Sequence, residues 1–120
     1  MIPTPRILIV DDDPRFPRVL PLALSSHGYE VTDAADGKEA LDAVADGPLG
    51  VIVLDWQMPG MDGLQTCRSL CLSFAAPVVM ISDDRSNPHE VALKAGANDY
   101  LAKLFSINDL LPRIKASLKS

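Results

Sequence analysis

Four apolar runs in this chain are each followed at once by a residue that could take part in metal or phosphate chemistry. These residues are an acidic triplet, a single aspartate, a serine and a lysine: Asp11-Asp12-Asp13, Asp55, Ser82 and Lys103. If the four runs are neighbouring parallel strands, their carboxyl ends meet at one edge of a sheet, where such sheets bind ligands. We therefore expect these side chains to share one shallow pocket.

The acidic residues in this set favour a divalent cation. Carboxylates gathered within about 5 Å of one another repel by a few kcal/mol per pair at the effective dielectric constant of a protein surface. Mg²⁺ fits best, because this hard ion is held by one or two carboxylates, waters and a phosphate. Zinc would require histidine or cysteine ligands, and none is placed near these positions.

With a cation bound, Asp55 is the candidate nucleophile of the set. A carboxylate can attack a phosphoryl group in line and form an acyl phosphate. Lys103 would pair with one phosphoryl oxygen, and Ser82 would donate a hydrogen bond to another. The chemistry predicted for this edge is therefore phosphoryl transfer to Asp55.

Apolar periodicity and turn residues indicate the elements that position these residues. The pattern predicts five strands alternating with five helices, the strands near 6–10, 30–33, 51–54, 77–81 and 99–102 and the last helix near 106–118. Gly28 and Gly96 are expected to close helices, Asp36-Gly37 to precede a helix over 38–45, and Gly63 to open the next helix. Such alternation predicts a parallel sheet with helices on both faces and right-handed crossovers.

Length and composition exclude several classes of protein. The 120 residues suffice for one domain with a core but not for two, so residues 1–120 are expected to form a single domain. The net charge of -5 gives the domain no electrostatic attraction for nucleic acid. Cys67 and Cys71 match neither a zinc motif nor a disulfide framework. We see no leader and no bilayer-spanning apolar run, and we expect a cytoplasmic protein without a membrane segment.

Four motifs, in their order and spacing, resemble the receiver domains of bacterial two-component response regulators. They are Ile-Val-Asp11-Asp12-Asp13, Leu-Asp55-Trp-Gln-Met-Pro-Gly-Met-Asp-Gly, Met-Ile-Ser82 and Asp99-Tyr100-Leu-Ala-Lys103. The resemblance covers nearly the whole chain. It implies an α/β, flavodoxin-like, doubly wound five-stranded parallel sheet with strand order 2-1-3-4-5 and five helices.

The resemblance implies a phosphoacceptor and a Mg²⁺ site. Asp55 would take the phosphoryl group from a sensor histidine kinase or a phosphotransfer protein. Asp12 would bind Mg²⁺ directly and Asp11 largely through water, with Asp55 and the backbone carbonyl of Gln57 as further ligands. The domain would promote its own phosphorylation and dephosphorylation, and would not be a turnover enzyme for a separate substrate.

The resemblance also implies a switch. Ser82 would be the switch hydroxyl, Lys103 the phosphate-binding amine, and Tyr100 the aromatic residue that turns inward when the hydroxyl moves. Phosphorylation would then change the surface around the fourth helix, the fifth strand and the fifth helix. On that surface, Asp99 and Arg113 match positions that pair across a homodimer in one subclass of response regulators, although an ordinary surface ion pair fits them equally.

Three features depart from the family's pattern. Leu104 follows Lys103 where proline is usual, and a cis bond to a residue other than proline costs roughly 2.5–4 kcal/mol, so we expect a trans Lys103–Leu104 peptide. Asp83 follows the switch hydroxyl where a small residue is usual. Pro17 and Pro21 are expected to delay or kink the first helix, because proline inside a helix costs roughly 3 kcal/mol or more.

Two other functions remain open at this point. A phosphatase resembling the haloacid dehalogenases would use the Asp11-x-Asp13 spacing, although the chain has no late acidic pair and no room for a cap domain. Its turnover would depend on Asp11 and not on Asp55. A receiver fold that binds partners independently of phosphorylation is kept open by Asp83 and Leu104.

Overall fold

The chain folds around one five-stranded parallel sheet in this computed structural model, which describes residues 6–11, 22–45, 49–55, 63–73, 76–82, 89–102 and 107–118. All neighbouring strands run parallel, in the order β2-β1-β3-β4-β5. The strands are β1 (Arg6–Val10), β2 (Glu30–Ala34), β3 (Val51–Asp55), β4 (Val78–Ser82) and β5 (Asp99–Ala102). The predicted doubly wound α/β fold and its strand order are confirmed.

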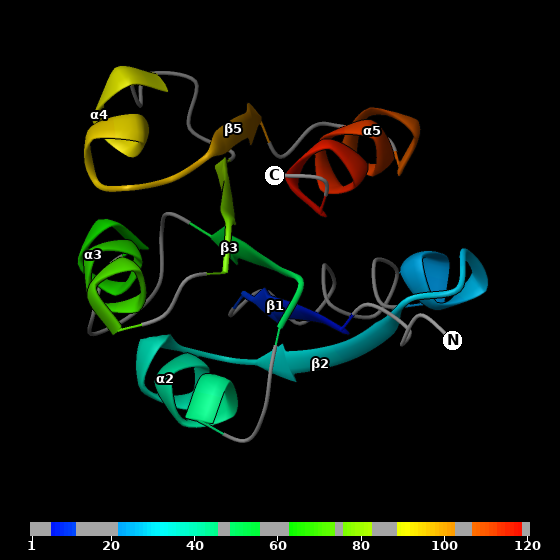
Figure 1. Cartoon of the computed structure of the whole chain (residues 1–120), viewed down its shortest axis with the longest axis horizontal. Helices are drawn as coiled ribbons and strands as arrows, with labels where there is room; N and C mark the ends of the chain where they lie inside the picture. Colours follow the sequence, from blue (N-terminus) through cyan, green and yellow to red (C-terminus); the bar gives the residue numbers. More distant parts are fainter. Residues whose placement is uncertain are drawn as a thin grey trace.

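Helices cover both faces of this sheet. They are α2 (Gly37–Ala45), α3 (Gly63–Ser73), α4 (His89–Lys94) and α5 (Ile107–Leu118), and residues 22–26 are also helical. Figure 1 shows α2, α3 and α4 on one side of the sheet, with α5 and the helical residues 22–26 on the other. Among the described residues, no helix has the length and apolar content needed to cross a membrane. The expected distortion at Pro17 and Pro21 lies outside the described residues.

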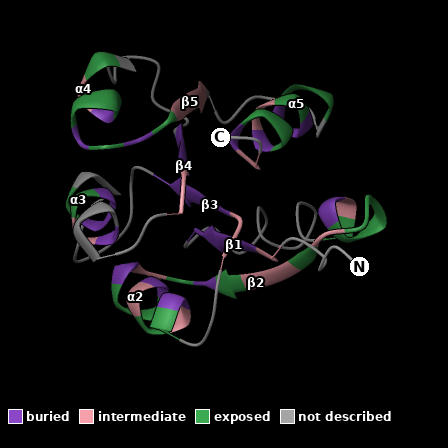
Figure 2. Ribbon diagram, viewed as in Figure 1, coloured by how far each residue is buried: buried purple, intermediate pink, exposed green. Residues whose placement is uncertain are grey.

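Alternate side chains of the inner strands enter two hydrophobic clusters, one on each face. Figure 2 shows that the inner strands of the sheet are largely buried. One cluster includes residues of α2, α3 and α4, and its members from the inner strands are Leu8, Val10, Ile52, Leu54, Val78 and Met80. The other includes Leu24 and residues of α5, and its members from the inner strands are Ile7, Ile9, Val51, Val53, Val79 and Ile81. These strands are thus buried on both faces, as their continuous apolar runs predict.

Two glycines close helices as predicted. Gly28 has a φ of 90°, its N–H donates to the Ser25 carbonyl at 3.0 Å, and the Tyr29 N–H donates to the Leu24 carbonyl at 3.3 Å. Gly96 has a φ of 108° and follows α4 with the same pair of bonds. This pattern, in which the chain turns through a left-handed residue, satisfies the last helical carbonyls.

The start of α2 is fixed by a reciprocal pair of side-chain hydrogen bonds. The Glu39 N–H donates to Asp36 Oδ1 at 2.8 Å, and the Ala35 N–H donates to Glu39 Oε2 at 2.9 Å. An acidic residue that caps a helix and a glutamate three residues later form such a capping box. These bonds hold the turn between β2 and α2 next to the carboxyl edge of the sheet.

Candidate functional site

The strand register places the backbones of three predicted site residues at one edge of the sheet. Val10 lies opposite Leu54, so the next residue on each strand, Asp11 and Asp55, stand level on neighbouring strands. Asp55 is in turn opposite Ile81 of β4, and Ser82 is the next residue. The backbones of Asp11, which directly follows β1, of Asp55 in β3 and of Ser82 in β4 therefore lie at the same edge of the sheet.

The two carboxylates at this edge are buried. Asp11 is 3% exposed and Asp55 is 2% exposed. The Asp11 N–H donates to the Ala34 carbonyl at 3.0 Å, which fixes the backbone of Asp11 against the end of β2. Removing a charged group from water costs several kcal/mol unless a compensating charge or hydrogen bonds offset it. Two level, buried aspartates thus form a centre of negative charge that favours a cation.

The donor atoms at this edge suit Mg²⁺. Asp11 and Asp55 offer oxygen ligands, which a hard ion with retained waters prefers. Within the described part of the chain, no group of three or more histidine, cysteine, aspartate or glutamate side chains could hold a metal ion. The predicted further ligands, Asp12 and Gln57, lie outside the described residues.

The remaining residues predicted for phosphate binding fall largely outside the described ranges. Ser82 is the last residue of β4 and pairs with Ala102 of β5. Lys103 follows Ala102 directly in the sequence but is not among the described residues. The predicted trans Lys103–Leu104 peptide and the placement of Asp83 also lie outside them.

Tyr100, the predicted switch aromatic, belongs to β5. Its side chain is partly buried and packs against the hydrophobic cluster that includes Leu54 and Met80. Leu54 directly precedes Asp55, and Met80 precedes Ser82 by two residues. The tyrosine ring thus packs against the same layer of side chains that supports the strand ends of the site.

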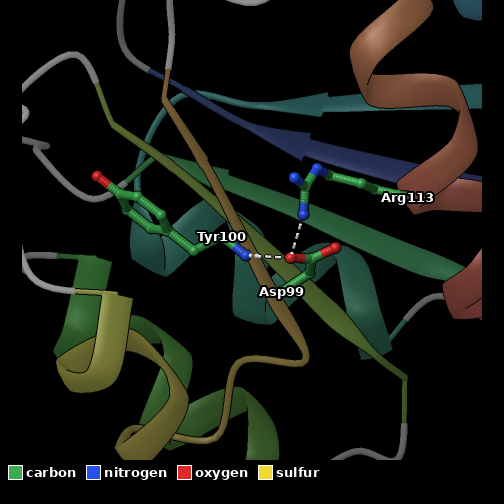
Figure 3. A network of polar contacts seen from close by, with 3 residues as sticks. All are labelled: Asp99, Tyr100 and Arg113. Atoms are coloured by element: carbon green, nitrogen blue, oxygen red, sulfur yellow. Dashed lines mark hydrogen bonds and ion pairs between the residues drawn. The ribbon is translucent and has the colours of Figure 1, made fainter.

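Asp99 and Arg113 form an ion pair within one chain. Arg113 Nη1 lies 2.5 Å from Asp99 Oδ1, and the Tyr100 N–H donates to the same oxygen at 2.8 Å (Figure 3). The sequence left open whether these residues pair across a dimer or within the chain. In this structure they connect β5 with α5 of the same molecule.

Sequence reasoning missed the unusual setting of Asp33. This residue lies in the edge strand β2, opposite Ile9 of β1. Its side chain reaches solvent, yet partial burial against the sheet raises the pKa of the Asp33 carboxyl above its usual value. A charged residue facing partly apolar surroundings on an edge strand is the sequence signal that could have indicated this shift.

Cys67 lies in the interior of the protein. It is buried and free, and its thiol donates to the Ala95 carbonyl at 3.5 Å. This contact joins α3 to the turn after α4. The thiol therefore contributes to the packing between α3 and the turn after α4.

Comparison with known proteins agrees with the observed fold. The family model of the response regulator receiver domain matches residues 7–115. A curated relative, the uncharacterized transcriptional regulatory protein YkoG of Bacillus subtilis (strain 168), is 43% identical over 115 residues, which are 94% of this chain and 50% of that protein. The chain spans about half the length of the curated relatives it matches.

Solved structures show the same similarity over nearly the whole chain. The receiver domain of the Francisella response regulator 1452 is 35% identical, with a TM-score of 0.89 and coverage of 97% of this chain and 98% of that one. The receiver domain of the sensor histidine kinase PA1611 from Pseudomonas aeruginosa PAO1 is 30% identical, with a TM-score of 0.89 and coverage of 98% and 100%. The latter structure has a magnesium ion coordinated in its active site cleft.

Proposed function

This chain belongs to the response regulator receiver domain family, and from that membership we propose that it is a phosphorylation switch with Asp55 as the phosphoacceptor. The observation that carries the proposal is the level placement of Asp11 and Asp55, both buried, at the carboxyl edge of the sheet. The switch unit comprises residues 1–120. The phosphoryl donor is a sensor histidine kinase or a phosphotransfer protein, and the setting is the cytoplasm.

Asp11, Asp12, Asp55 and the backbone carbonyl of Gln57 hold Mg²⁺ in this proposal. The oxygen donors and the burial of two of the carboxylates support this assignment. When bound, Mg²⁺ offsets the negative charge of the carboxylates and of the incoming phosphoryl oxygens. The bond from the Asp11 N–H to the Ala34 carbonyl fixes the backbone of Asp11 at this edge of the sheet.

The transfer step is an in-line displacement at phosphorus. A carboxylate oxygen of Asp55 forms a bond to phosphorus while the bond from phosphorus to the donor's imidazole nitrogen breaks, and the released imidazole takes up a proton from water. Lys103 pairs with one phosphoryl oxygen, and the Ser82 hydroxyl donates to another. The protein's contribution is positioning and charge neutralisation.

The readout lies on the surface of α4, β5 and α5. Ser82 is joined to β5 through its pairing with Ala102, and Tyr100 lies two residues earlier on that strand. A shift of Ser82 toward the phosphoryl group is transmitted to Tyr100 and to the α4–β5–α5 face. Asp99 and Arg113, which pair within the chain in this structure, lie on that face, and we propose that a second copy of this chain binds there.

Phosphorylation in solution tests the proposal. Wild-type protein and the Asp55→Asn variant are incubated with Mg²⁺ and acetyl phosphate, and their intact masses are measured. The proposal predicts one phosphoryl adduct on wild type and none on the variant. An adduct of equal yield on both proteins would refute Asp55 as the acceptor.

A phosphatase assay distinguishes the phosphorylation switch from the alternative function, a phosphatase. The haloacid dehalogenase-like reading predicts steady turnover of p-nitrophenyl phosphate that Asp11→Asn abolishes and Asp55→Asn preserves. The switch predicts no such turnover. The match of the receiver-domain family model to residues 7–115 favours the switch.

A further inference from the structure

One peptide group connects the acidic edge of the sheet with the surface of α2. Its carbonyl belongs to Ala34 at the end of β2 and accepts a hydrogen bond from the Asp11 N–H at 3.0 Å. Its N–H belongs to Ala35 and donates to Glu39 Oε2 at 2.9 Å. Because a peptide group is planar and rigid, the Glu39 carboxylate and the Asp11 backbone are joined through a single stiff unit.

The two ends of this connection lie in different surroundings. Asp11 is buried, whereas Glu39 is exposed. Ala34 lies between them, is 4% exposed, and packs in the same hydrophobic cluster as Val10, its partner on β1. The connection therefore extends from the protein surface, through backbone that the core holds in place, to a buried aspartate.

The first turn of α2 sets the position of Glu39. The Glu39 N–H donates to Asp36 Oδ1 at 2.8 Å, and the Ala40 N–H donates to the Asp36 carbonyl at 3.0 Å. Ala40 and Val44 anchor the other side of this helix in the core. The helix thus presents the Glu39 carboxylate to the Ala35 N–H in a defined geometry.

The charge of Glu39 strengthens the hydrogen bond on the far side of the peptide group. A hydrogen bond to a carboxylate is stronger than one between neutral groups. Successive hydrogen bonds also polarise one another, by about 10–30% per bond. The anion at the Ala35 N–H makes the Ala34 oxygen more negative and hence a better acceptor for the Asp11 N–H. The Asp11 backbone is held more firmly as a result.

We propose that Glu39 is a positioning residue for the Mg²⁺ site, which it supports by holding Asp11 in place through the peptide group between Ala34 and Ala35. This inference rests on the proposed Mg²⁺ site, in which Asp11 is a ligand. The capping box alone accounts for the start of α2. The additional observation is that its glutamate bonds to the peptide group whose carbonyl holds Asp11.

Four variants separate this role from charge and from helix capping. Glu39→Ala removes the bond to the Ala35 N–H, whereas Glu39→Gln removes the charge and keeps an oxygen that can accept that bond. Asp42→Ala removes one charge from an exposed position about one turn further along α2. Asp36→Ala removes the other bond of the capping box and leaves the Glu39 carboxylate in the chain.

The amide proton resonance of Asp11, measured without metal, reports on the bond to the Ala34 carbonyl. A weaker hydrogen bond moves an amide proton upfield. We expect the resonance to move upfield in Glu39→Ala, and Glu39→Gln to lie closer to wild type than to Glu39→Ala. Asp42→Ala should leave the resonance unchanged. An equal movement in Asp36→Ala and Glu39→Ala would overturn the proposal, because loosening of the helix start would then explain it.

Titration of the folded proteins with Mg²⁺, followed by amide resonances, measures the consequence for the site. Groups that hold a metal ligand directly typically change metal affinity by about 10–100-fold. Because Glu39 acts through an intervening peptide group, we expect Glu39→Ala to weaken Mg²⁺ binding at least about threefold. Glu39→Gln should again lie closer to wild type than to Glu39→Ala. Asp42→Ala should stay within about twofold of wild type, because salt screens an exposed charge.

The titration also separates this role from the metal site itself. A wild type that binds Mg²⁺ and a Glu39→Ala variant with the same affinity would overturn the role of Glu39 and leave the metal site in place. Equal weakening in Glu39→Gln and Glu39→Ala would overturn it too, because loss of charge alone would then explain the effect. A wild type that does not bind Mg²⁺ would refute the proposed metal site, and the role of Glu39 with it.

Discussion

The Asp55→Asn substitution should stabilise the protein in the absence of Mg²⁺. Asp11 and Asp55 are level on adjacent strands, whose backbones lie about 4.8 Å apart. Two negative charges on the order of 5 Å apart repel by about 3 kcal/mol at an effective dielectric constant of 20. Asparagine has nearly the same shape as aspartate but no charge. Because local polar groups already offset part of the repulsion, we expect a gain of about 1–3 kcal/mol in the free energy of unfolding.

Thermal unfolding with and without Mg²⁺ measures this effect. A domain of this size gains roughly 4 °C in Tm per kcal/mol, so Asp55→Asn should melt about 4–12 °C above wild type in EDTA. Adding Mg²⁺ at a hundredfold excess over its dissociation constant should stabilise wild type by about 2.7 kcal/mol and narrow the difference. The increase in Tm on adding Mg²⁺ should be smaller for Asp55→Asn than for wild type.

The control for this prediction is Asp42→Asn. Asp42 is an exposed carboxylate of α2, so the change removes the same charge from a position outside the acidic edge. It should leave the free energy of unfolding, both in EDTA and with Mg²⁺, within about 0.5 kcal/mol of wild type. A variant Asp55→Asn that melts below wild type in EDTA, or a wild-type Tm that Mg²⁺ does not change, would refute the electrostatic reasoning.

Three further substitutions test the fold around the site. Gly28→Ala should cost about 1–2 kcal/mol in urea unfolding, because Gly28 has a φ of 90°, which a residue with a Cβ adopts at a penalty; an unchanged midpoint would contradict this. Pro112→Ala should stabilise the protein by about 1–3 kcal/mol in the same assay, since it restores a backbone donor inside α5; a lowered midpoint would show that the proline fits its site. Burial raises the pKa of the Asp33 carboxyl, so the folded state binds a proton at Asp33 more tightly than the unfolded chain does. This tighter binding stabilises the fold at low pH. The stabilisation is lost as the pH rises from the usual aspartate pKa through the raised pKa of the folded state. Asp33→Asn should therefore be more stable than wild type at pH 7, and a difference that persists below the usual aspartate pKa would contradict this cause.

The strands and helix ends could be predicted because their signals are local. Continuous apolar runs mark strands buried on both faces, and Gly28 and Gly96 supply the left-handed residues that end helices. The prediction for β4 began one residue early, at Pro77. Because proline has no N–H to donate to a neighbouring strand, β4 begins at Val78. The Pro77 carbonyl still accepts a hydrogen bond from the Ile52 N–H at 2.9 Å.

The meeting of three candidate residues at one edge of the sheet could be predicted, but their burial could not. Asp11, Asp55 and Ser82 each follow an apolar strand, and parallel pairing brings such strand ends together. The near-complete burial of Asp11 and Asp55 depends on how the surrounding chain packs, which spacing does not encode. The intrachain partner of Arg113 likewise depends on the rotation of α5 relative to β5.

The most direct test of the central claim locates the acyl phosphate on the chain. Wild-type protein treated with acetyl phosphate and Mg²⁺ is reduced with borohydride, which converts the phosphorylated aspartate to homoserine, and the peptides are sequenced by mass spectrometry. If Asp55 is the phosphoacceptor, homoserine appears at position 55 and only there. Homoserine at position 11, or at no position although a phosphoryl adduct is present in the intact mass, would contradict it.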